Sequence, residues 1–207
     1  MNHLLIWLAE GNLASDGLAD EVVRLVSANL DLLPDLVVGL HAPDAALRGH
    51  AADALEKLAR SHPEAVVRFL PDLTRAATQD RVPMVRWHMA MTLGHLSVFP
   101  DRVPQLADAL FFLLQDGSIS TRCWAMVSLC ILARQYPELV ERAVAIIAPL
   151  SDFASAALRS KVRHALHVLT NPSAPFPKGW VKSSRLQHLY QGNAYDTPQI
   201  HSTHHIP

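Results

Sequence analysis

Small and apolar residues recur at a helical spacing in four stretches of the chain, and each stretch follows an arginine. After Arg48, Arg86, Arg122 and Arg159, such residues fall near the third, fourth, seventh and tenth positions. That spacing places them along one stripe of an α-helix, and the strict alternation typical of a strand occurs nowhere. The four arginines are 38, 36 and 37 residues apart. The pattern therefore predicts four helices that repeat with a nearly constant period.

A second marker keeps the same period: a ring-bearing residue followed by a proline and an acid. It begins at His62, Phe99 and Tyr136, at intervals of 37 residues. Proline cannot continue a helix but suits the first turn of the next one, so each marker predicts a helix end followed by a helix start. Each unit is then a pair of helices. The first helices are expected at 31–40, 64–77, 101–115 and 138–150, and the second helices at 45–60, 83–98, 119–134 and 155–170.

Paired helices that repeat every 36 to 38 residues resemble the HEAT repeat family, whose unit is two antiparallel helices. The resemblance implies an all-α fold, a right-handed α-α solenoid with an extended C-terminal tail. In this division residues 1–170 form the solenoid, and residues 171–207 form a Pro-rich tail that is partly docked. The solenoid consists of an N-terminal cap at 1–30, with helices near 3–10 and 17–29, and of repeats at 31–61, 62–98, 99–135 and 136–170.

The resemblance also implies a structural role for the arginines. In the family, an aspartate six positions before the arginine tends to take part in a ladder of hydrogen bonds between neighbouring repeats. The middle repeats meet this pattern, with Asp80/Arg86 and Asp116/Arg122. The first repeat has an alanine there, and the fourth has Asp152 one residue early. Ladder bonding, and not ligand binding, is expected for Arg48, Arg86, Arg122 and Arg159.

On each second helix, the positions one, two, five, eight and nine after the arginine lie outside the core stripe. In the first repeat they are typical of a solvated face: Gly49, His50, Asp53, Glu56 and Lys57. In the third repeat they are apolar and in the second they are mixed, which indicates a binding site or a covered surface. The candidate binding residues are therefore Trp87, His88, Met91, His95, Trp124, Val127 and Ile131.

The tail is one candidate to cover that face. It carries apolar side chains, and its three basic residues and one acid oppose the fifteen basic and eighteen acidic residues of the remaining chain. We expect residues 172–190 to fold back along the second-helix face of the later repeats, and residues 196–207 to stay mobile. A thicker core and an external protein or peptide partner are two further possibilities that the sequence leaves open. The apolar anchors of the tail are Phe176, Trp180, Leu189 and Tyr190.

Composition limits the possible functions. The chain is 50% hydrophobic and has a formal charge of -1, which argues against a strongly electrostatic nucleic-acid or membrane binder. The N-terminus lacks a basic n-region, and no apolar stretch reaches the ~18 residues of a membrane span. Cys123 and Cys130 lie two turns apart on one predicted helix, too far to pair, so a reducing compartment and a cytoplasmic protein are expected.

No catalytic or cofactor motif is recognisable. Phosphate-binding glycine loops and the GxSxG and HExxH patterns are missing from the sequence. We expect no cofactor and no metal. The histidine groups considered are His88/His95, His164/His167 and His201/His204/His205. The first histidine pair is too widely spaced to chelate one ion, the second lacks an evident acidic partner, and the terminal group would bind transition metals only adventitiously.

The expected function is non-catalytic. HEAT repeats imply a protein-protein interaction or scaffold module, which would bind a peptide or protein partner along the concave, second-helix face. The alternative is a HEAT-like enzyme, DNA glycosylase-like or a bilin lyase, that uses the same groove. Such glycosylases place a carboxylate near their tryptophans, and the predicted helices of Trp87 and Trp124 contain none. The partner and the oligomeric state stay open.

Overall fold

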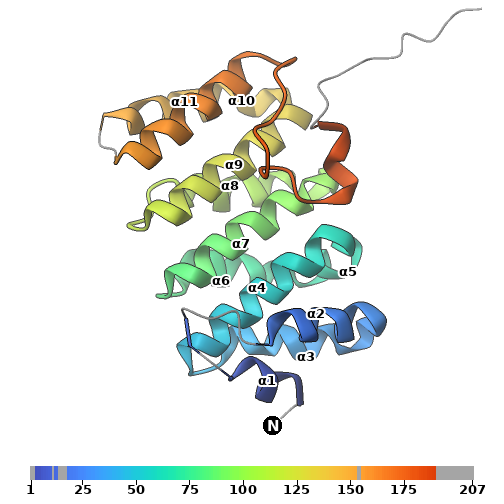
Figure 1. Cartoon of the computed structure of the whole chain (residues 1–207). Coiled ribbons are helices and arrows are strands. Elements are labelled where there is room, and N and C mark those ends of the chain that lie inside the picture. The colour runs from blue at the N-terminus through green and yellow to red at the C-terminus, as the bar shows by residue number, and fades with distance from the viewer. Residues whose placement is uncertain (1–2, 11, 14–17, 153–154, 190–207) are drawn as a thin grey trace, which may run out of the picture.

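The structure, a computed structural model, describes residues 3–10, 12–13, 18–152 and 155–189 (Figure 1). Every regular element within these ranges is a helix. The α-helices are α1 His3–Leu8, α2 Ala19–Ala28, α3 Leu33–Val38, α4 Ala45–Ser61, α5 Pro63–Val66, α6 Leu70–Gln79, α7 Pro83–His95, α8 Val103–Leu113, α9 Ile119–Gln135, α10 Val140–Ile147 and α11 Ala156–Thr170.

The helices stack into an all-α solenoid, as the sequence predicts. The second helices form one layer in which α4 packs on α7, α7 on α9, and α9 on α11. The first helices form the other layer, where α6, α8 and α10 each pack on the second helix of the same repeat. The core lies between the layers, and its leucines are fully buried, among them Leu55, Leu58, Leu93, Leu129 and Leu132.

The second helices match their predicted bounds closely because their ends carry clear signals. The side chains of Asp44, Ser118 and Ser155 accept hydrogen bonds from backbone N–H groups in the first turns of α4, α9 and α11. Such side-chain caps satisfy donors that have no partner inside the helix. At the other end, the marker prolines Pro63 and Pro137 follow directly on the residues that close α4 and α9.

The first helices are more broken than predicted. The single helix expected at 64–77 is three elements: α5, a 3-10 turn at Val67–Phe69, and α6. Each first-helix segment contains a further proline, such as Pro71 in α6 and Pro104 in α8. A proline inside a helix removes one backbone donor and clashes with the preceding turn, so the helix restarts there.

The arginines form a ladder that runs between repeats. Arg48 donates from Nε to Oδ2 of Asp80 at 2.7 Å, and Arg86 donates from Nε to Oδ2 of Asp116 at 2.6 Å. Each aspartate also accepts a 2.7 Å bond from a backbone N–H of its own loop. Arg48 and Arg86 therefore each bind the aspartate of the following repeat, and that aspartate fixes the loop before the next second helix.

The ladder stops at the third repeat. Arg122 donates to the backbone carbonyl of Asp116, within its own repeat, where the ladder would require an aspartate of the next one. The expectation of an inter-repeat carboxylate partner for Arg122 is therefore wrong. The displaced Asp152 explains this, because it lies exposed and takes its hydrogen bond from Ser151.

Replacing Arg86 should cost far more stability than replacing Arg122. Arg86→Ala leaves the mostly buried carboxylate of Asp116 without its ion pair, and we expect a loss of about 2–3 kcal/mol. Arg122→Ala removes a bond to one backbone carbonyl, and we expect about 1 kcal/mol. Urea unfolding of both variants measures the difference. Equal losses would contradict the ladder.

Candidate functional site

The seven candidate binding residues separate into two groups in the structure. Trp87, His88 and Trp124 are partly exposed. The other four are buried: Met91, His95, Val127 and Ile131. The division reflects what covers the second-helix face, because the chain's own tail lies over the C-terminal halves of α7 and α9 (Figure 1).

Trp180 of the tail fills the groove between these two helices. It lines a common space with five of the candidate residues, and no water-sized volume remains between them. Trp180 is 5% exposed, so nearly all of its ring is removed from water. The burial of so large an apolar surface is the main favourable contribution of the tail. The five residues are Met91, His95, Trp124, Val127 and Ile131.

Polar contacts fix the tail on both sides of Trp180. Before it, Arg134 of α9 donates to the carbonyl of Ala174 at 2.9 Å, and its guanidinium lies 4.8 Å from the ring centre of Phe176. After it, the hydroxyl of Ser183 donates to the carbonyl of Arg60 at 3.2 Å. The tail therefore passes beyond the later repeats, where we expected it to end, and reaches α4 of the first repeat. Tyr190 and residues 196–207 lie outside the described residues.

The outward face of α4 is not solvated, contrary to the prediction. Of its five positions, Gly49, His50, Asp53 and Glu56 are buried. The N-terminal segment covers one end of this face, because the two ring nitrogens of His50 lie 2.7 and 3.1 Å from the carbonyls of Leu8 and Asn12. The face is polar in sequence but lies under another part of the chain.

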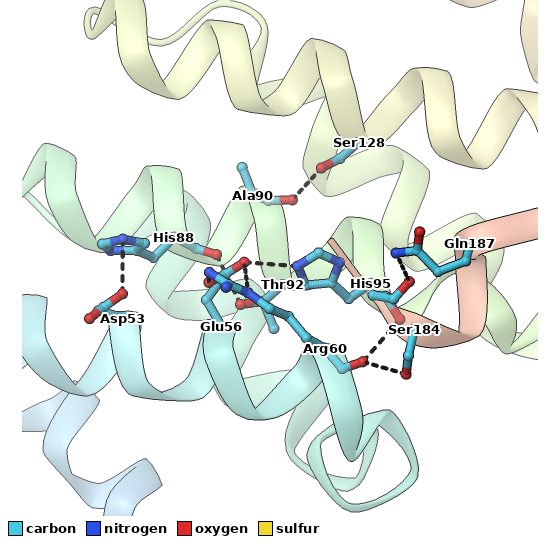
Figure 2. Close-up of polar contacts among 11 residues, drawn as sticks. Asp53, Glu56, Arg60, His88, Ala90, Thr92, His95, Ser128, Ser184 and Gln187 are labelled. Carbon is cyan, nitrogen blue, oxygen red and sulfur yellow. Dashed lines mark hydrogen bonds and ion pairs between the residues drawn. The ribbon is translucent and has the colours of Figure 1, made fainter. Parts of the chain in front are cut away.

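A buried carboxylate lies under the tail at the other end of α4. Glu56 is fully buried and accepts hydrogen bonds from Nε2 of His95 at 2.8 Å and from Nε of Arg60 at 3.0 Å (Figure 2). Burial alone raises the pKa of Glu56, but these two donors outweigh it and bring the pKa down to about 2. Glu56 therefore links α4 to α7 as a paired anion.

A second ionic cluster lies one turn earlier on α4. Asp53 is 2.8 Å from the ammonium of Lys57 and 3.5 Å from Nε2 of His88, as Figure 2 shows for the histidine. Burial lowers the pKa of His88, although the charge of Asp53 opposes this effect. His88 therefore contributes a largely neutral ring at neutral pH, next to the partly exposed indole of Trp87.

Trp124 lies beside two lysines from different parts of the chain. Nζ of Lys182, in the tail, is 4.9 Å from the ring centre of Trp124. Nζ of Lys161, in α11, is 5.7 Å from the same ring and 4.9 Å from the ring of Trp180. Ammonium groups at these distances are attracted by the electron-rich ring faces. Among the described residues, the charged groups found over Trp124 are therefore cations.

The remaining chemistry of the described residues is sparse. No group of three potential metal ligands occurs among them, and the terminal histidines from His201 onward lie outside them. Burial raises the pKa of Cys123 and Cys130, which keeps both thiols protonated. Within the described chain, no helix combines the length and the apolar character needed to cross a membrane.

Residues 33–129 match the family model for HEAT repeats. A search of curated proteins finds no match. Among solved structures, the chain is similar to one chain in the complex of CpcE and CpcF of phycocyanin lyase from Nostoc sp. PCC7120. The two are 25% identical with a TM-score of 0.62, and the match covers 78% of this chain and 95% of that chain.

Two further structural matches are not natural proteins. An engineered protein is 20% identical with a TM-score of 0.59, over 80% of this chain and 79% of that chain. A designed armadillo repeat protein is 18% identical with a TM-score of 0.57, over 91% of this chain and 79% of that chain. At these identities the matches establish the fold alone.

The buried Glu56 should make stability fall in acid. Its pKa is lowered on folding from 4.5 to about 2, so its contribution is complete above about pH 5 and is lost as the pH falls towards 2. Between about pH 6 and about pH 3, we expect the wild type to lose about 2 kcal/mol more than Glu56→Gln. Urea unfolding of both proteins at each pH measures this, and parallel acid losses would show that Glu56 is not a paired anion.

Proposed function

We propose that the protein is a HEAT-repeat interaction module whose partner binds on the second-helix face, at Trp87, His88 and Trp124. The observation that carries the proposal is the exposure of two tryptophans, partly open to water, on the adjacent helices α7 and α9. Tryptophan is enriched among the residues that dominate protein-protein binding energy, because it combines a large apolar surface with one polar group. HEAT repeats present such residues on a rigid support.

The buried members of the candidate site have a supporting role in this proposal. Met91, His95, Val127 and Ile131 hold Trp180, which in turn fixes the tail beside Trp124. The partner therefore meets a composite surface made of solenoid and tail. Such a surface is ordered before binding, which lowers the entropy that binding costs. The two free, protonated thiols fit a reducing cytoplasm as its place of action.

A second candidate function is favoured by the match to the phycocyanin lyase complex. This chain aligns with 95% of one chain of that complex at 25% identity. The protein would then be one subunit of a two-chain lyase, and its partner would be the second chain. The distinguishing measurement is lyase activity on a phycocyanin-type protein, which must require both chains. The glycosylase-like alternative has no comparable support.

A photo-crosslinking residue at Trp87 should capture the partner in the source cell. Benzoylphenylalanine at this position is expected to give discrete adducts that mass spectrometry identifies. The matched control is the same residue at Phe112, an aromatic position on first helix α8 that is 59% exposed. No adduct at Trp87, or the same adducts at Phe112, would contradict binding on the second-helix face.

A further inference from the structure

Lys161 and Lys182 have no acidic partner within the part of the chain that the structure describes. Both ammonium groups lie within 6 Å of the ring centre of Trp124. Among the described residues, neither lysine takes part in an ion pair, whereas Lys57 binds two aspartates. Both lysines are also partly withdrawn from water. Two like charges beside one ring repel each other, and a ligand that brings carboxylates to both ammonium groups would offset that repulsion.

The two carboxylates whose charges act on Lys182 are already bound to other groups. Glu56 is held by His95 and Arg60, and Asp53 by Lys57. The pKa of Lys182 reflects this: burial lowers it, although the charges of Glu56 and Asp53 act in the opposite direction. The ammonium of Lys182 is therefore only partly compensated within the chain.

The net charge of residues 153–195 also favours an anionic ligand. Residues 153–195 contain six basic residues and no acid, which leaves twelve basic and nineteen acidic residues for the remaining chain. Helix α11 and the tail therefore form the basic part of an otherwise acidic protein. The six basic residues are Arg159, Lys161, Arg163, Lys178, Lys182 and Arg185.

An acidic protein segment fits this surface better than nucleic acid does. The remaining chain has an excess of seven acidic residues over basic ones, and a polyanionic backbone would be repelled wherever it extended beyond α11 and the tail. A peptide can place one or two carboxylates at the lysines and apolar side chains on the exposed parts of Trp87 and Trp124. That combination matches the chemistry of the surface in both charge and polarity.

We propose that the partner binds through an acidic segment whose carboxylates pair with Lys161 and Lys182 at Trp124, while its apolar side chains pack on the tryptophans. This inference rests on the proposed function and adds the chemical class of the partner. It assigns the tail a direct part in recognition, because Lys182 is in the tail and Lys161 is in the solenoid. Only the docked tail brings the two charges together.

The test is binding of a fluorescent peptide that alternates glutamate with phenylalanine to the full-length protein, measured by anisotropy. Lys161→Gln and Lys182→Gln should each weaken binding by about fivefold, and the double variant by about 20-fold. Lys182→Arg should restore most of the affinity, since it keeps the charge. The matched control is Lys178→Gln, which removes an exposed lysine from the same tail and should change binding little.

Several outcomes would overturn the inference. A peptide with glutamine in place of glutamate should bind weakly, so equal binding would exclude carboxylate recognition. Equal weakening by Lys178→Gln would indicate a general charge effect and not a site. Tighter, lysine-dependent binding of a single-stranded oligonucleotide would assign the surface to nucleic acid. Lysine-dependent self-association in light scattering would assign it to a second copy of the chain.

Crosslinking at Trp87 in the lysine variants distinguishes binding on the second-helix face from recognition of an acidic segment. If the adducts captured at Trp87 persist unchanged in the Lys161→Gln/Lys182→Gln variant, a partner binds the second-helix face without using the lysines. The interaction module then stands and the acidic partner is wrong. Loss of those adducts in the double variant, but not in Lys178→Gln, supports both.

Discussion

The insertion of Trp180 between α7 and α9 determines which part of the second-helix face is available. Its ring covers Met91, Val127 and Ile131, and it leaves Trp124 partly exposed at the edge. Without this contact, the apolar positions of two repeats would face water as one large patch, which proteins rarely leave uncovered. The solenoid and its tail therefore form one structure, and the binding surface is made by both.

The same contact places charge as well as apolar surface. Because Trp180 is held in the groove, the residues that follow it pass by Trp124 towards α4, and Lys182 comes to lie beside the same indole ring as Lys161. The tail then reaches the backbone of Arg60, the residue whose side chain holds the buried Glu56 (Figure 2). Trp180 thus fixes a tail that contacts α4 of the first repeat and contributes Lys182 to the basic surface near α11.

Much of the fold can be predicted because its signals are local and repeated. The arginine and proline markers give the period, and capping residues such as Asp44 and Ser118 fix the starts of second helices. The interior prolines of the first helices, such as Pro71, are equally visible in the sequence and explain the breaks that the prediction missed. The apolar second-helix positions are also evident from their spacing alone.

The covered face of α4 could not be predicted in the same way. A helix pattern reports polarity, but it does not report which distant segment lies above the helix. His50 and Glu56 are buried because the N-terminal segment and α7 bring partners to them from about 40 residues away. Two pairs at a spacing of four, Asp53–Lys57 and Glu56–Arg60, show that the charges can neutralise each other, but not that they are buried.

Nuclear Overhauser effects between the indole ring of Trp180 and the methyl groups of Val127 and Ile131 measure whether the tail occupies the groove between α7 and α9. In the full-length protein, with these methyl groups labelled, we expect strong contacts from the indole ring to both residues. We also expect chemical shifts far from random-coil values for the tail from Ala174 to Leu189. An absence of these contacts, with random-coil shifts throughout the tail, would show that the tail is undocked and that the second-helix face is open.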